Sequence, residues 1–116
     1  MIRWPMATTN FIKVGRVEDF QEGIIQAFKV DEAEVGIVTW EGGFYAFQNH
    51  CTHQGNPLDE GGFIGPTNEI ICTWHFACFD LQTGRLTDGP AYSGLSMYDV
   101  RVEDGDVLVD KEPRPE

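Results

Sequence analysis

The chain has 116 residues, the size of one domain, and 41% of them are hydrophobic, as in an ordinary globular protein. Eight basic residues stand against nineteen acidic ones, so the net charge is −11. Between Asp31 and Asp110 the only bases are Arg85 and Arg101, against fourteen acids. Such a surface repels phosphate backbones and anionic lipid, which excludes nucleic acid as a partner and disfavours membrane binding.

The location of the protein is predicted from its apolar segments and its cysteines. Apolar runs reach no more than five residues, too few to span a bilayer, and the first ten residues lack the apolar region of a secretory signal. We therefore expect a cytoplasmic protein. Its odd set of cysteines, Cys51, Cys72 and Cys78, argues against a framework of disulfides alone. In a reducing compartment, the more useful question is what the thiolates bind.

Strand signals dominate the chain, and only Val17 to Gly23 suggests a single helical turn. Glu41-Gly42-Gly43, Gln82-Thr83-Gly84 and Asp104-Gly105 stand between β-rich runs and predict hairpin turns. The predicted strands are Phe11–Val14, Ile24–Val30, Val35–Trp40, Phe44–Phe47, Phe79–Leu81, Arg85–Leu86, Tyr98–Val102 and Val107–Val109. They predict an all-β fold of six to ten short strands, as a small antiparallel sandwich or barrel.

One domain is expected over residues 11–110, preceded by an N-terminal extension at 1–10. Residues 111–116 read as a flexible tail. Two segments depart from the strand pattern, His50 to Pro66 and Cys72 to Ala77. They hold all three histidines and two of the three cysteines, and we expect both to be loops, which are where function is concentrated.

The chemistry-bearing residues form two short motifs, Cys51-Thr52-His53 and Cys72-Thr73-Trp74-His75, separated by 18 residues. Two loops of this kind, brought together by a sheet, would supply two thiolates and two imidazoles. That donor set suits a structural zinc ion, and it also suits a Rieske [2Fe–2S] cluster, in which two histidines replace two cysteines on one iron. Zinc fingers usually place both cysteines in one half, whereas here each half is mixed. The mixed halves favour the two-iron cluster.

The stretches Cys51–Leu58, Ile71–His75 and Phe79–Gly84 resemble a Rieske domain, most closely the small ferredoxins of bacterial aromatic-ring dioxygenases and related monooxygenases. Gly89-Pro90-Ala91 resembles the proline loop that shields the cluster in that family, and the ending from Tyr98 to Val109 matches as well. The resemblance covers roughly residues 11–110, with a cluster-binding part of two loops at about 48–91.

The resemblance implies one [2Fe–2S] cluster, with Cys51 and Cys72 on the inner iron and His53 and His75 on the outer iron. It implies an electron carrier rather than an enzyme. By the same resemblance, the carrier would accept single electrons from a flavoprotein reductase and pass them to a terminal oxygenase. A monomer is the expected state, because a shuttling carrier must release each partner in turn.

Some positions depart from respiratory Rieske proteins, which brace the two loops with a disulfide. Here Asn56 and Trp74 stand at those positions. Respiratory proteins also place hydroxyl groups where this chain has Ala77 and Phe79. Because hydrogen bonds to the cluster sulfurs raise the reduction potential, their loss predicts a value near the low end of the Rieske range, around −150 mV.

Several residues next to the motifs have two possible roles. His50 is an alternative ligand or a surface residue that caps the loop, and Cys78 is a redox thiol or a packing residue. Trp74 and Phe76 either contact a partner or shield the cluster, and Gln54 is a candidate contact at the rim.

Three alternative functions stay open from the sequence. They are the Rieske-like small subunit of an assimilatory nitrite reductase, a zinc-stabilised interaction module and a redox sensor that uses Cys78. Three histidines, two already assigned, are too few for the additional mononuclear iron site of a terminal oxygenase.

Overall fold

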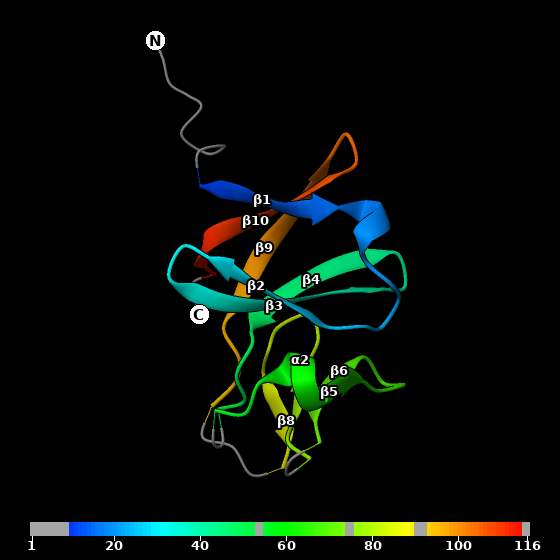
Figure 1. The fold of residues 1–116 in the computed structure, drawn as a ribbon. Helices are drawn as coiled ribbons and strands as arrows, with labels where there is room; N and C mark the ends of the chain where they lie inside the picture. Colours follow the sequence, from blue (N-terminus) through cyan, green and yellow to red (C-terminus); the bar gives the residue numbers. More distant parts are fainter. Residues whose placement is uncertain (1–9, 53–54, 74–75, 90–92, 115–116) are drawn as a thin grey trace.

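Two antiparallel sheets lie at opposite ends of the molecule (Figure 1) in the computed structural model, which describes residues 10–52, 55–73, 76–89 and 93–114. The larger sheet has the order β1 (Phe11–Arg16), β10 (Asp106–Pro113), β9 (Met97–Glu103), β4 (Gly43–Gln48), β3 (Ala33–Trp40) and β2 (Gln26–Val30). The smaller sheet has the order β5 (Gly62–Ile64), β6 (Glu69–Cys72), β7 (Cys78–Asp80) and β8 (Leu86–Asp88). The described residues also form a 3₁₀ turn, η1 (Val17–Asp19), and a single α-helical turn, α2 (Leu58–Gly61). The all-β prediction is confirmed.

Strand β3 explains how the two sheets share the hydrophobic residues. Val35 and Ile37 belong to a core cluster inside the larger sheet, whereas Val38 belongs to a second cluster that contains residues of the smaller sheet. Both faces of β3 are therefore covered, which is why its sequence is a nearly continuous apolar run instead of an alternating one. On β4, Ala46 and Phe47 divide between the two clusters in the same way.

The smaller sheet is an insertion between β4 and β9, two neighbouring strands of the larger sheet. The chain leaves β4 at Gln48 and returns just before β9 at Ser96. These two residues are joined by a pair of hydrogen bonds, from the Gln48 amide to the Ser96 carbonyl at 2.9 Å and from the Ser96 amide to the Gln48 side chain at 2.7 Å. The ends of the insertion are therefore held together.

The hairpin predictions hold, and the prediction of two loops needs correction. The turns at Glu41-Gly42, Gln82–Gly84 and Asp104-Gly105 each join strands that pair antiparallel. The segment from His50 to Pro66, however, contains α2 and β5, and the unpredicted strand β6 follows it. These elements are too short to show a period, and their strands form only by pairing with one another.

The prediction of a flexible tail at residues 111–116 is wrong for residues 111–113, because they belong to β10. The Lys111 amide donates to the Asn10 carbonyl at 2.9 Å. The Arg114 guanidinium then reaches Asp99 at 2.7 Å and the Gln82 carbonyl at 2.9 Å. Composition alone suggested a tail, because strand pairing and an ion pair with a distant residue leave no local signal. No helix in the described part of the chain is long and apolar enough to cross a membrane.

A close approach of backbone fixes the smaller sheet against the start of β9. Gly84, in the turn between β7 and β8, has a φ of +79°, and its carbonyl accepts a 2.7 Å hydrogen bond from the Leu95 amide. A Cβ atom on Gly84 would lie 2.3 Å from the Leu95 carbonyl oxygen, and one on Gly94 would lie 2.5 Å from the Gly84 oxygen. Only glycine fits at this crossing, and Leu95 and Met97 beyond it enter the core beside the smaller sheet.

We expect Gly84→Ala to lower the free energy of unfolding by about 2–4 kcal/mol, because left-handed strain and an overpacked contact add together. Gly42→Ala is the control, since Gly42 has a φ of +87° with nothing within 4 Å of the added Cβ. The control should lose only about 1 kcal/mol in urea unfolding. Equal losses in the two variants would show that the crossing does not hold the sheets together.

Candidate metal centre

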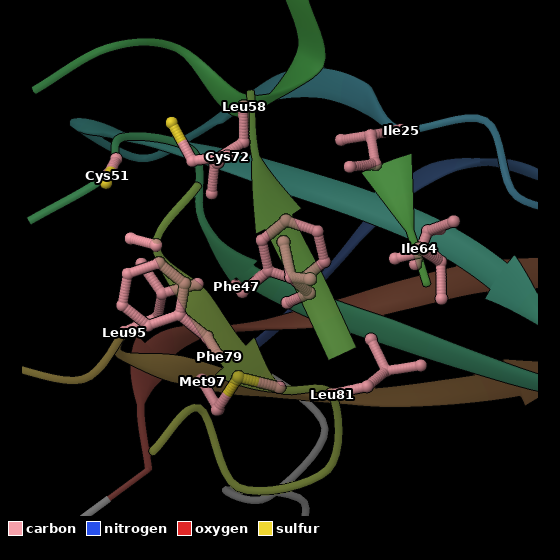
Figure 2. Close-up of a cluster of buried hydrophobic side chains, with 13 residues drawn as sticks. Ile25, Phe47, Cys51, Leu58, Ile64, Cys72, Phe79, Leu81, Leu95 and Met97 are labelled. Carbon is pink, nitrogen blue, oxygen red and sulfur yellow. The ribbon is translucent and has the colours of Figure 1, made fainter. Parts of the chain in front are cut away.

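Two of the predicted ligands, Cys51 and Cys72, lie in the core cluster between the sheets. Their exposed fractions are 2% and 1%. Figure 2 shows both toward one end of that cluster with Leu58, and it shows Phe47 and Phe79 farther in. Cysteines from two segments far apart in the sequence are thus buried in the same part of the molecule, away from water.

The backbone forms the same turn around both cysteines. The Cys51 amide donates to the Asn56 carbonyl at 2.9 Å, and the Gly55 amide donates to the Cys51 carbonyl at 2.8 Å. At the second turn the Cys72 amide donates to the Ala77 carbonyl at 2.9 Å, and the Phe76 amide donates to the Cys72 carbonyl at 2.7 Å.

The likeness of the two turns extends to their ends. His50 pairs with Pro57 across the first turn, and Ile71 pairs with Cys78 across the second, at matching positions. The fourth residue after each cysteine has a positive φ, +76° at Gly55 and +60° at Phe76. Each half of the motif therefore has the same local fold, although one histidine follows its cysteine by two residues and the other by three.

A threonine after each cysteine ties its turn to another part of the insertion. The Thr52 hydroxyl donates to the Ser93 carbonyl, and the Thr73 hydroxyl donates to the Gly61 carbonyl. The Thr73 amide also donates to Gly61, at 3.1 Å. The first turn is thereby linked to the segment before β9 and the second to the end of α2, which restrains both cysteines.

The two predicted histidine ligands, His53 and His75, lie outside the described residues, as do Gln54 and Trp74. Among the residues that the structure describes, no group of three or more His, Cys, Asp or Glu side chains could hold a metal ion. The structure thus brings the two cysteines into one cluster and leaves the four-residue ligand set a prediction.

Asn49, which the sequence did not single out, holds the first turn in place through hydrogen bonds to β3 and α2. It is fully buried, and its side-chain amide donates to Asp59 at 2.7 Å and to Glu34 at 3.3 Å. Its side-chain oxygen accepts the Asp59 amide at 3.1 Å, and its carbonyl accepts the Leu58 amide at 2.6 Å. One side chain therefore joins β3, α2 and the residues before Cys51. Its polar character gave no sign of burial in the sequence.

His50 lies on the surface beside this anchor. Its Nε2 is 3.0 Å from the Glu34 carboxylate, and its side chain is partly exposed. Its carbonyl accepts a 3.0 Å hydrogen bond from the Gln48 side chain. These contacts agree with the interpretation of His50 as a surface residue that caps the loop.

Cys78 does not have the environment of a reactive thiol. Burial, followed by the negative charges of Glu69 and Asp88, raises the pKa of the Cys78 thiol. Its sulfur lies 3.6 Å from the Phe76 carbonyl. Since the thiolate is the reactive form, a raised pKa disfavours the redox-sensor alternative.

Ala77 and Phe79, the positions without hydroxyl groups, are fully buried in the same cluster as the two cysteines. Gly89 lies against this second turn, because a Cβ placed on it would come within 2.6 Å of the Phe76 carbonyl oxygen and the Ala77 Cα. The stretch that begins at Gly89 continues into Pro90 and Ala91, which lie outside the described residues.

Comparison with known proteins identifies the family. The model of the Rieske [2Fe-2S] domain matches residues 10–99. The chain belongs to the Rieske [2Fe–2S] family. The biphenyl dioxygenase ferredoxin subunit of Pseudomonas sp. (strain KKS102) is 33% identical over 101 residues, which cover 87% of this chain and 92% of that subunit.

Solved Rieske ferredoxins have the same fold. The ferredoxin of carbazole 1,9a-dioxygenase from Nocardioides aromaticivorans IC177 is 33% identical, with a TM-score of 0.81 over 86% of this chain and 96% of its own. A chain in the complex of reduced oxygenase and oxidised ferredoxin of carbazole 1,9a-dioxygenase is 30% identical, with a TM-score of 0.82 over 92% of this chain and 98% of its own. The likeness thus extends over almost the whole length of these Rieske proteins.

The described residues fit the cofactor of the Rieske family. A [2Fe–2S] cluster needs cysteine thiolates held away from water, and Cys51 and Cys72 provide two buried sulfurs on two restrained turns. The amides of the cysteine and of the fourth residue after it are paired in the same way in both turns. The donor chemistry and the symmetry of the two turns both suit this cofactor.

We expect Asn49→Asp to weaken the site without changing its size. The substitution replaces the amide donor with an oxygen that faces the carboxylates of Asp59 and Glu34, in a buried position. The loss should be about 3 kcal/mol or more, and iron should leave faster in the presence of a chelator.

The measurements are the thermal midpoint and the rate at which visible absorbance is lost. Gln26→Ala serves as the control, since it removes only an exposed hydrogen bond to the Asp19 carbonyl, outside the insertion that carries the cysteines. Iron loss at the same rate in both variants would contradict the anchoring role of Asn49.

Proposed function

We propose that this chain is the ferredoxin of a multicomponent oxygenase system, carrying single electrons to the terminal oxygenase. The observation that carries the proposal is the match to dioxygenase ferredoxins over nearly the whole length of both chains. The chain itself does no chemistry on an organic substrate, so the aromatic compound on which the system acts is determined by the oxygenase.

In this proposal Cys51 and Cys72 hold the inner iron of the cluster, and His53 and His75 hold the outer iron. The cluster supplies one-electron chemistry when bound. The protein's own residues shield the two cysteine sulfurs from water and hold the two turns in place. The proposal assigns the exchange of electrons with both partners to the two histidines of the ligand set.

The electron donor in the proposal is a flavoprotein reductase, and the acceptor is a terminal oxygenase. The carbazole dioxygenase ferredoxin, which matches 92% of this chain, is known in a complex with its oxygenase. A monomer in the cytoplasm fits a carrier that binds each partner in turn through a small contact. The acidic surface would steer the chain toward basic faces on its partners.

The single domain in the proposal runs from residue 11 to the end of β10 at Pro113, with the cluster held by about 48–91. The insertion between β4 and β9 supports this division, because it starts after Gln48 and carries both cysteines. Residues 1–10 stay a predicted extension.

The test of the function is an absorption and EPR spectrum of the purified protein before and after dithionite. We expect a red-brown protein that is EPR-silent when oxidised and gives the rhombic Rieske signal when reduced. A colourless protein with one zinc per chain, prepared without air, would overturn the electron-carrier proposal and support the interaction module.

The ligand set is tested by three variants. His53→Ala and Cys72→Ala should each abolish the cluster and its EPR signal. Cys78→Ser is the matched control and should keep both, because the proposal does not use Cys78 as a ligand and burial raises the pKa of its thiol. Iron content per chain reports the outcome, and a metal-free Cys78→Ser protein would disprove the assignment.

We expect Ala77→Ser to raise the reduction potential from about −150 mV, because a hydroxyl group at this buried position would match the one in respiratory Rieske proteins and would donate a hydrogen bond to the cluster. One hydrogen bond of about 1 kcal/mol corresponds to about 40 mV for a one-electron couple. Redox titration followed by absorption measures the change. Ala27→Ser, on β2 of the larger sheet, should leave the potential unaltered, and an unaltered value in Ala77→Ser would contradict the expectation.

A further inference from the structure

Phe76 is exposed at the second turn although it is one of the most apolar side chains of the protein. Its exposed fraction is 64%, the highest among the large hydrophobic residues that the structure describes as exposed. It stands next to His75 in the sequence and donates its amide to the Cys72 carbonyl. The ring therefore buries little within this chain, close to the proposed point of electron transfer.

The backbone of Phe76 has a conformation that a bulky residue seldom adopts. Its φ is +60°, and the other non-glycine residues with positive φ in the described part of the chain are Asp31, Glu41, Asn68 and Asp104, all polar. Left-handed conformations are costly for residues that carry a large side chain, and such outliers gather at functional sites.

The first turn serves as an internal comparison. Gly55 occupies the same place after Cys51 that Phe76 occupies after Cys72, makes the same hydrogen bond and has the same sign of φ. Glycine is the residue that suits this geometry. The second turn has a phenylalanine there instead, and its ring gains little burial inside the chain to offset the strain.

The surroundings of Phe76 are acidic. Its turn is tied to Gly61, which directly follows Asp59 and Glu60 in the chain, and it lies against Gly89, which directly follows Asp88. All three carboxylates belong to exposed residues. The Asp59 carboxylate accepts the Asn49 amide, and Glu60 and Asp88 directly precede the two glycines at this turn. An apolar ring on an acidic part of the surface is complementary to an apolar pocket bordered by basic side chains.

We propose that Phe76 is the apolar anchor by which this chain docks on its terminal oxygenase, inserting its ring into a pocket rimmed by lysine or arginine. The inference rests on the proposed function and adds the residue that carries the binding. Interfaces depend on a few aromatic anchors near their centre, with charges at the rim that set the rate of association.

The test uses the cluster-loaded chain with the terminal oxygenase from its own source. Phe76→Ala and Phe76→Gly should each raise the dissociation constant for the oxygenase by at least about tenfold, with the EPR signal and the reduction potential unchanged. Ile24→Ala, which truncates another exposed apolar side chain at 51% exposure, should bind as the wild type does. Added salt should slow association of the wild type and the variants by the same factor, since the ring carries no charge.

The stability of the two variants separates docking from a structural role. Phe76→Gly should melt about 3 °C above the wild type and above Phe76→Ala, because glycine relieves the left-handed strain. Melting of Phe76→Gly below the wild type would show that the ring stabilises this chain and would overturn the inference.

Electron transfer by the wild type distinguishes a failure of the proposed electron-carrier function from a failure of the docking inference alone. If the reduced wild type passes no electrons to the oxygenase, the proposed function fails. If the wild type does so and the Phe76 variants bind the oxygenase equally well, only the docking inference fails. Weakened transfer from the reductase alone would overturn it as well, because the anchor would then belong to the other partner.

Discussion

The architecture depends on two turns of similar shape, which hold two cysteine side chains in one buried hydrophobic cluster. Each cysteine donates and accepts one backbone hydrogen bond within its turn, so backbone pairing fixes the shape of both turns. Burial at 2% and 1% exposure places both sulfurs away from water. A site of this kind needs its scaffold fixed from several sides, because neither turn is longer than a few residues.

The larger sheet provides that support through the residues at the ends of the insertion. Gln48 and Ser96 join its two ends, and Asn49, the next residue, ties the first turn to β3 and α2. A second attachment is the crossing of Gly84 and Gly94, which brings the β7–β8 turn against the start of β9. Polar contacts and a close approach of backbone thus act together with the shared hydrophobic cluster in holding the smaller sheet.

The sequence predicted the features that have a local signal. Hairpin turns such as Asp104-Gly105 and the apolar run of β3 follow from turn chemistry and residue pattern, and the Cys and His motifs identified the site region. Strands β5 and β6 escaped prediction because they lie in and beside the segments assigned as loops around the Cys and His motifs, whereas the equally short β7 and β8 flank the Gln82–Gly84 turn. Asn49 escaped because its role depends on Glu34 and Asp59, which only the fold brings near.

The two turns have matching backbone hydrogen bonds, so the differences between their sequences indicate what each turn does beyond binding a metal. Gly55 satisfies the positive φ at no steric cost, and a Cβ there would meet nothing within 4 Å. The first turn therefore has room for a side chain and carries none. The second turn has an exposed phenylalanine in an unfavourable conformation. Because the described backbone hydrogen bonds are the same in both turns, the proposed contact with the oxygenase accounts for a phenylalanine that the turn itself does not require.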